Sequence, residues 1–178
     1  MSFVPHNALT IKAIGMARMI QSNVGVSLPA TSPEEATQKQ IKINQYQGIW
    51  DTGATNSVIT KKVIDELELK PTGAKEVYHA QGKTIANSYL VNIILPNQVT
   101  IFAINVTEGV LNEIDVLIGM DIITLGDFSI TNKNRKTVMS FRVPSCKEID
   151  YVPESDEYNH VMRNGNKKLK ERFEAKYK

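Results

Sequence analysis

The sequence predicts a mostly β domain that contains one or two short helices. Short apolar stretches with a period of two recur between residues 8 and 144, and prolines and glycines separate them, which is typical of strands joined by turns. Apolar residues fall at helical spacing in short segments only, near residues 60–70 and 120–125. The chain of 178 residues, with 42% hydrophobic and 22% charged residues, has the size and composition of one soluble globular domain with tails.

The first elements lead into the most informative motif of the chain. Residues 24–28 alternate between apolar and small or polar side chains and predict a half-buried strand that ends at Pro29. The segment 30–40 is polar, contains a second proline and lacks periodicity, so we expect an inserted surface loop there. Apolar residues in the segment 41–50 mark the next strand, which delivers Asp51 at its end.

A short helix and a long hairpin follow. The helix is predicted from residue 60 onwards and ends before Pro71, because proline interrupts helical hydrogen bonding. Two alternating stretches between residues 75 and 95 flank the polar pair Gln81-Gly82, and this pattern predicts a hairpin with its tip near Gly82, where a residue without Cβ can adopt positive φ. Residues 99–106 predict a further strand.

The second half repeats the order of apolar strand, glycine turn and short helix. The run 116–118 reaches Gly119, a helical stretch follows, and Gly126 stands where a C-cap glycine is expected. A closing strand ends at Pro144, so we place the domain at residues 1–144.

Residues 145–178 are expected to form a polar, basic tail that is either flexible or helical. From Arg163 to the end of the sequence there are seven basic residues and two acidic ones. Nucleic-acid binding through phosphate contacts stays open, but the tail shows no interleaved base-stacking pattern and no known nucleic-acid-binding module. A solvated tail is therefore favoured, and nucleic acid is an unlikely partner.

The composition argues against several classes of protein. The sequence has one cysteine, Cys146, and three scattered histidines, so neither a disulfide nor a metal motif is expected, and no cofactor is implied. No apolar run approaches the roughly 20 residues that a membrane span needs. The first residues lack the apolar stretch of a signal peptide, so we expect a cytoplasmic protein with no membrane contact.

The stretch GIWDTGATNSVI, residues 48–59, is compatible with two kinds of active site. It contains a strand that delivers an aspartate in Asp-Thr-Gly, and it also resembles the phosphate-binding motif of the actin, sugar-kinase and heat-shock ATPase superfamily. That superfamily has a much longer, two-lobed domain, and no second phosphate loop is visible downstream in this sequence. We therefore favour the aspartate chemistry, although an aspartate after a strand is sometimes only a turn or helix-cap residue.

The sequence resembles the retropepsins, the single-domain aspartic proteases of retroviral type, over about residues 20–144. The resemblance rests on Asp51-Thr52-Gly53-Ala54 after a strand, on Gln81-Gly82 in a flap-like hairpin, and on Leu117-Ile118-Gly119 before a short helix. The Ile-Gly-x-Asp form, with Asp121, is more similar to cellular and bacterial members. The loop at 30–40 and the single glycine at the flap tip depart from the compact viral enzymes. The resemblance implies a closed, barrel-like fold.

Only one Asp-Thr-Gly occurs in the sequence, whereas hydrolysis by aspartates needs two carboxylates that share one proton. Each chain is then half of a site, and we expect a homodimer with two copies of Asp51 on its two-fold axis. The predicted function is that of an aspartic endopeptidase acting on extended protein or peptide segments. The alternative is a catalytically silent retropepsin-fold module for dimerisation or peptide binding.

The resemblance also assigns roles to individual residues. It implies that Asp51 is catalytic, that Thr52 locks the paired loops, that Gly53 leaves room for substrate and that Ala54 lines the cleft. The expected flap and substrate contacts are Tyr78, Gln81, Gly82 and Ile85. Gly119 and Asp121 are expected to be structural, with Asp121 capping the short helix or pairing with a basic side chain. Residues 8–20 and 137–144 are candidates for sealing the dimer.

Overall fold

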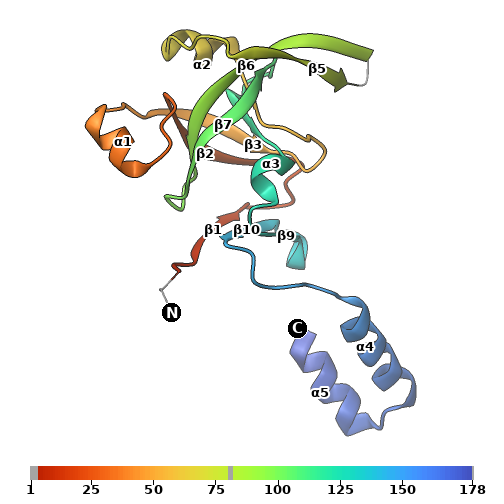
Figure 1. Cartoon of the computed structure of the whole chain (residues 1–178). Coiled ribbons are helices and arrows are strands. Elements are labelled where there is room, and N and C mark those ends of the chain that lie inside the picture. Colours follow the sequence, from red (N-terminus) through yellow and green to blue (C-terminus); the bar gives the residue numbers. More distant parts are fainter. Residues whose placement is uncertain (1–3, 80–81, 178) are drawn as a thin grey trace. The chain divides into compact units, whose positions relative to one another are not determined.

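The computed structural model describes residues 4–79 and 82–177. The chain divides into two compact units, Met1–Cys146 and Lys147–Lys178. Figure 1 shows the strands gathered in the first unit and two helices in the second. No helix among the described residues combines the length and apolar character needed to cross a membrane.

The first unit is built mostly of strands. They are β1 (Asn7–Lys12), β2 (Ile20–Ser27), β3 (Asn44–Trp50), β4 (Val58–Ile59), β5 (Gly73–His79), β6 (Gly82–Ile94), β7 (Thr100–Glu108), β8 (Val116–Ile118), β9 (Asp127–Thr131) and β10 (Val138–Val143). The helical elements are α1 (Pro33–Gln38), α2 (Lys61–Glu66), α3 (Met120–Ile123) and the 3-10 turn η1 (Lys133–Arg135). The prediction of a mostly β fold with few short helices is confirmed.

The larger sheet closes on itself. Its strand order in the described residues is β2-β3-β8-β4-β7-β6-β5, and β2 also pairs with β6, which joins the two ends of the sheet into a ring. Only β5 lies outside the ring, as the outer strand of a hairpin with β6 (Figure 1). A closed sheet leaves fewer unpaired edges, and its inward-facing apolar side chains form one core.

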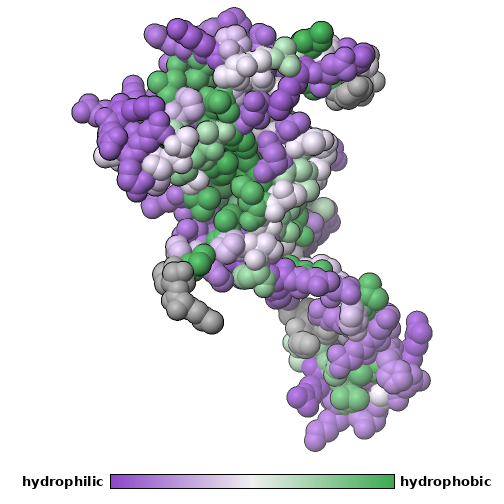
Figure 2. All heavy atoms as spheres, viewed as in Figure 1, coloured by the Kyte–Doolittle hydropathy of each residue, from purple (hydrophilic) through white to green (hydrophobic). Residues whose placement is uncertain are grey.

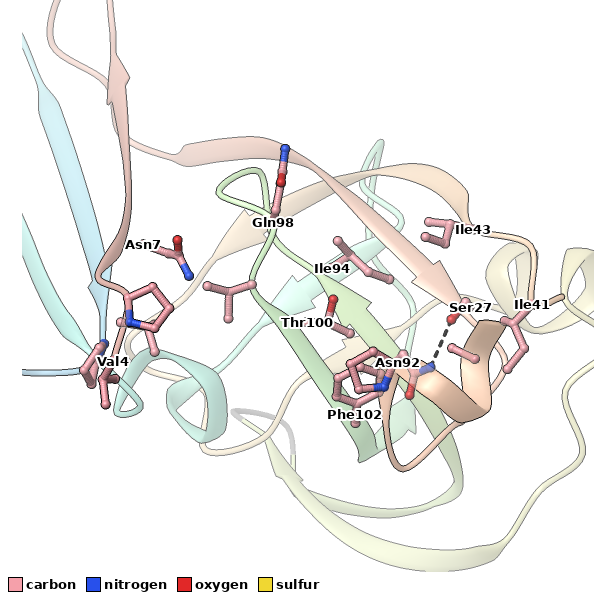
Figure 3. Close-up of a pocket in the computed structure, with 16 residues that line it drawn as sticks. Val4, Asn7, Ser27, Ile41, Ile43, Asn92, Ile94, Gln98, Thr100 and Phe102 are labelled. Atoms are coloured by element: carbon pink, nitrogen blue, oxygen red, sulfur yellow. Dashed lines mark hydrogen bonds between the residues drawn. The ribbon is translucent and has the colours of Figure 1, made fainter. Parts of the chain in front are cut away.

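The side chain of Asn92 holds the ring where the pairing of β6 and β7 changes register. Such a bulge leaves backbone groups outside the regular ladder. The Oδ1 atom of Asn92, a residue with 2% exposure, accepts from the backbone N–H of Ala103 at 2.9 Å and of Ala30 at 3.1 Å. Its Nδ2 donates to Ser27 Oγ at 3.2 Å and to the carbonyl of Leu28 at 2.9 Å. One buried amide therefore fastens the bulge to the chain that leaves β2 (Figure 3).

Trp50, the last residue of β3, connects the ring to a second sheet with the order β1-β10-β9. Its ring stacks on Phe128 at a centroid distance of 6.0 Å and meets Phe141 at 5.1 Å. Its Nε1 donates to Ser22 Oγ at 3.0 Å, which satisfies the polar end of this buried side chain. Trp50, the residue before Asp51, is thus held by ring contacts with the second sheet and by a hydrogen bond to Ser22 in the ring.

The segment 30–40 contains α1, whereas the sequence analysis predicted an irregular loop. Ser32 is the N-cap of this helix, and its side chain accepts from the backbone N–H of Glu35 at 3.2 Å. Pro33 occupies the first turn, where a missing N–H leaves no helical hydrogen bond unmade. The helix buries no residue, so its sequence shows no apolar periodicity, and local capping holds it together.

The second unit consists of α4 (Val152–Asn164) and α5 (Lys167–Tyr177). The expectation of a flexible or helical tail is thus met by two helices, and Val161 is buried within the unit. Asn166 Oδ1 accepts from the backbone N–H of Leu169 at 3.0 Å and starts α5. The basic residues that the sequence analysis singled out lie mainly on α5, while the acidic residues Glu154, Asp156 and Glu157 lie on α4.

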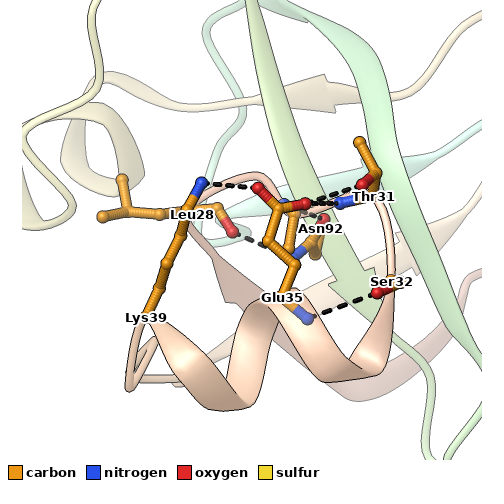
Figure 4. Close-up of polar contacts among 7 residues, drawn as sticks. Leu28, Thr31, Ser32, Glu35, Lys39 and Asn92 are labelled. Atoms are coloured by element: carbon orange, nitrogen blue, oxygen red, sulfur yellow. Dashed lines mark hydrogen bonds and ion pairs between the residues drawn. The ribbon is translucent and has the colours of Figure 1, made fainter.

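The carboxylate of Glu35 completes the cap of α1. It accepts from the backbone N–H of Thr31 at 2.6 Å, from Thr31 Oγ1 at 2.7 Å and from Lys39 Nζ at 2.5 Å (Figure 4). The hydrogen bond from Lys39, followed by those from Thr31, lowers the pKa of Glu35 from its ordinary value of 4.5 to about 2.

Acidification is expected to weaken this cap. Because the pKa of Glu35 is lower in the folded chain than the ordinary 4.5, its contribution to stability is complete above pH 4.5 and is lost as the pH falls to about 2. An NMR titration of the Glu35 side-chain carboxyl should show a midpoint near 2, and Lys39→Met should raise that midpoint. A wild-type midpoint at 4.5 would contradict the cap.

Candidate active site

The pairing of β3 with β8 determines where Asp51 lies. The two strands run parallel, with Gly48 opposite Val116 and Trp50 opposite Ile118. The ladder continues one step further, because the backbone N–H of Asp51 donates to the carbonyl of Ile118 at 3.0 Å. Asp51 is half-buried at the end of the strand, as the sequence predicted.

The loop after Asp51 turns back on its carboxylate. The backbone N–H of Gly53 donates to Asp51 Oδ1 at 2.8 Å, and the N–H of Ala54 donates to the carbonyl of Asp51 at 3.3 Å. A Cβ at position 53 would lie 3.2 Å from the same Oδ1. A side chain there would press on the carboxylate, so glycine suits this position. Thr52 and Gly53 are exposed.

Gly119 lets the loop cross the end of β8. That strand lies between β3 and β4, so the chain leaves on one side of β8 at Asp51 and returns on the other at Val58. A Cβ at Gly119 would lie 2.6 Å from the carbonyl carbon and 2.7 Å from the carbonyl oxygen of Asn56. The loop backbone also accepts from α3, because the Met120 N–H donates to the Ala54 carbonyl at 2.8 Å.

Asp121 and Ser57 hold the far end of the loop. Ser57 is fully buried; its backbone N–H donates to Asp121 Oδ2 at 2.8 Å, and its hydroxyl donates to Asp121 Oδ1 at 2.8 Å. The same hydroxyl accepts from the backbone N–H of Gly119 at 3.1 Å. Asp121 therefore has a structural part in the fold, because its side chain binds the loop. Within the described residues it neither caps α3 nor pairs with a basic side chain.

Sequence reasoning missed Ser57, which it treated as part of a turn. Ser57 and Asp121 are 64 positions apart, and no local pattern connects them. The spacing of Asp121 from Gly119 was the only signal that this aspartate belongs to the turn.

The predicted flap is the hairpin of β5 and β6. The two strands pair from Gly73 opposite Ser88 to His79 opposite Gly82, and Gly82 has a φ of 128°, which suits glycine. Gln81 and the side chain of Tyr78 lie outside the described residues. Ile85 stands opposite Glu76 on one face of the hairpin and is 78% exposed.

A pocket of about 360 Å³ lies between this hairpin and the loop that carries Asp51. The described residues that line it come from the loop, from β4, from β5 and from β7: Gly53, Ala54, Thr55, Asn56, Val58, Lys75, Glu76, Val77 and Thr107. Gly53 and Ala54 thus line the same pocket as residues of the flap strand β5. The flap residues that line this pocket belong to β5, and the predicted flap residue Ile85, on β6, is absent from the described lining.

Another pocket of about 640 Å³ lies near α1, away from the Asp-Thr-Gly loop (Figure 3). Its described lining is mostly apolar, and Figure 2 shows hydrophobic residues gathered on the sheet next to α1. Asn92 lines it, but the hydrogen bonds of that amide are made within the fold. No acidic, basic or cysteine side chain is among the described lining residues, so this lining offers no general acid or base to activate the hydroxyl groups of Ser27 and Thr100.

Other aspartates of the first unit have structural partners. Asp115 Oδ1 accepts from Lys62 Nζ at 3.1 Å, and Asp127 binds the guanidinium of Arg142. Asp51 is different, since its carboxylate accepts only from Gly53 within the described part of the chain. Among the described residues no group of three or more His, Cys, Asp or Glu side chains is arranged to hold a metal ion.

A family model described as "gag-polyprotein putative aspartyl protease" matches residues 37–124. The matched segment contains the Asp-Thr-Gly loop, the flap hairpin and the turn at Gly119. Through this segment the chain belongs to the retropepsin-like aspartyl protease family. The retropepsin-like fold predicted from the sequence is confirmed.

Two solved structures are similar to this chain. The crystal structure of a retropepsin-like aspartic protease from Rickettsia conorii is 15% identical, with a TM-score of 0.46, and the match covers 80% of this chain and 98% of that one. The structure of the foamy viral protease-reverse transcriptase in complex with an RNA/DNA hybrid is 17% identical, with a TM-score of 0.38, and the match covers 84% of this chain and 16% of that one. No curated protein matches the sequence.

Replacing Gly119 by alanine should destabilise the first unit. The added Cβ would lie 2.6 Å from a backbone carbon of Asn56, which cannot move without shifting the loop. We expect a loss of about 1–3 kcal/mol in the free energy of unfolding. Gly15→Ala is the matched control, since a Cβ there would meet nothing within 4 Å. Urea unfolding of the two variants measures the difference, and equal stabilities would contradict the close contact.

Proposed function

We propose that the protein is a homodimeric aspartic endopeptidase that hydrolyses peptide bonds in extended protein segments. The observation that carries the proposal is the geometry of Asp51. Asp51 stands at the end of β3, in a loop whose backbone is hydrogen-bonded to β8 and α3, beside a pocket that the flap hairpin helps to line. The chain also belongs to a family of aspartyl proteases.

The chemistry needs two such carboxylates. Held in contact, a pair shares one proton, because two like charges at that distance resist ionising together. The ionised member takes a proton from water while the protonated member gives its proton to the oxygen of the scissile carbonyl, and water oxygen bonds to the carbonyl carbon. Proton transfer to the amide nitrogen then breaks the carbon–nitrogen bond and releases an amine and a carboxylic acid.

The features of the loop support these roles. The Gly53 N–H holds one oxygen of the Asp51 carboxylate, which orients the side chain without neutralising it. Thr52 is exposed beside Asp51 and is available to a second copy of the loop. The glycine at position 53 leaves space in front of the carboxylate for water and for the substrate backbone.

The second sheet supports dimerisation. The candidate regions 8–20 and 137–144 lie side by side, because β1 pairs with β10 along its whole length. Both outer strands of this sheet, β1 and β9, have an edge that pairs with no other described strand. In the segment that follows β1, the side chains of Ile14, Met16 and Met19 are exposed and offer apolar surface to a second chain.

Replacement of Asp51 by asparagine should abolish hydrolysis. Asparagine keeps the size of the side chain and an oxygen for the Gly53 N–H, so the fold should persist, whereas the group that accepts a proton from water is lost. We expect the turnover of a peptide substrate to fall at least about a hundredfold. Asp65→Asn is the matched control, because Asp65 is exposed and pairs with Lys61 on α2. Unchanged cleavage by Asp51→Asn would exclude the mechanism, and peptide binding without cleavage by the wild type would favour the silent module.

Mixing experiments test whether two chains share one site. When wild type and Asp51→Asn are mixed in equal amounts and allowed to exchange, random pairing leaves about one quarter of the dimers with two intact chains. Activity per total dimer should fall to that level, and a mixture of wild type with Asp65→Asn should remain fully active. Activity at one half of the wild-type value would mean that each chain acts alone.

A further inference from the structure

The pocket beside the Asp-Thr-Gly loop contains a lysine on the flap strand. Lys75 and Val77 are half-buried and lie on the same face of β5, since side chains alternate along a strand. Both line the pocket together with Gly53 and Ala54. Glu76, which lies between them, also contributes to the lining; its cross-strand neighbour is Ile85.

Lys75 differs from the other lysines near the cleft. Lys61, Lys62 and Lys83 each pair with a carboxylate, Asp65 at 2.7 Å, Asp115 at 3.1 Å and Glu76 at 3.0 Å respectively. Lys75 has no ion pair or side-chain hydrogen bond within the described chain. Glu76 is the acidic residue of the described pocket lining, and its carboxylate forms an ion pair with Lys83.

The remaining polar lining is neutral. Thr55, Asn56 and Thr107 line the pocket, and Thr107 is only 3% exposed. A peptide that covers the pocket removes water from the Lys75 ammonium group. A carboxylate replaces that water with a charge-assisted hydrogen bond, whereas an apolar or basic side chain leaves the charge without a partner. Discrimination then comes as much from the penalty on wrong side chains as from attraction to the right one.

We propose that Lys75 selects substrates with an aspartate or glutamate side chain close to the cleaved bond. The inference rests on the proposed function, because it names the substrate class for the same cleft. The pocket is lined by Gly53 and Ala54, the second and third residues after Asp51. Because an extended peptide advances about 3.3 Å per residue, the side chain that enters this pocket belongs to a residue within about two positions of the scissile bond.

Cleavage-site profiling of a proteome-derived peptide library tests the inference. The wild-type dimer should enrich aspartate and glutamate at one position within about two residues of the cut. Lys75→Met should lose this enrichment, and Lys75→Glu should replace it by enrichment of lysine and arginine. Lys70→Met is the matched control, since Lys70 is exposed and is not part of the described pocket lining; its profile should equal that of the wild type.

Two peptides that differ only in having glutamate or glutamine at the selected position measure how strongly the enzyme prefers an acidic side chain. The wild type should prefer glutamate by about tenfold in kcat/KM, a preference that falls at high salt. In Lys75→Met the ratio of kcat/KM between the two peptides should fall to about one, whereas a general loss of structure would lower both values in proportion and keep the ratio. An acidic preference that survives Lys75→Glu, or a wild type with no acidic preference, would overturn the inference.

Binding separates this inference from the proposed function. The affinity of the same two peptides for Asp51→Asn, and for Asp51→Asn combined with Lys75→Met, reports selectivity without any chemistry. If the wild type cleaves no peptide, the proposed hydrolysis fails, but a glutamate preference in binding that depends on Lys75 still supports the inference. If cleavage occurs and binding shows no such preference, only the role of Lys75 fails.

Discussion

The crossing of the Asp51 loop over the end of β8 is the constraint on which the rest of the structure depends. The strand before the loop and the strand after it lie on opposite sides of β8, so the loop must pass over the end of that strand. Gly119 directly follows β8, and the backbone of Asn56 lies where its side chain would be. The position of Asp51 is therefore set by a contact between backbones, which has little freedom to change.

Hydrogen bonds fix the crossing from both ends. At the first end, the Asp51 N–H extends the ladder of β8. At the second end, the hydroxyl of Ser57 donates to Asp121 and accepts from the Gly119 N–H, so that a fully buried side chain connects both segments. Buried polar groups of this kind are costly when a partner is missing, so the network favours a single arrangement of the loop.

The flap hairpin is an extension of the closed sheet. β6 belongs to the closed sheet, and β5 extends from it with one half-buried face and one exposed face. Lys75 and Glu76 both contribute to the pocket lining, but only Glu76 pairs with a described side chain, Lys83. Because the strand alternates, neighbouring residues of opposite charge can serve separate purposes. Lys75 supports substrate recognition, as we propose, and Glu76 stabilises the hairpin through its pair with Lys83.

The sequence by itself determined the position of Asp51 after a strand, the hairpin that ends near Gly82 and the glycine turn at Gly119, because alternation and glycine placement report local backbone geometry. Tertiary structure decided the rest. It placed Ser57 against Asp121, which is 64 residues away, and it selected the face of β5 that lines the pocket, since period-two alternation defines two faces but not what each one meets. The helix α1 escaped prediction because it buries no side chain and depends on the contacts of its cap. Local patterns specify local conformation, whereas the partner of a side chain depends on which distant segments the closed sheet brings together.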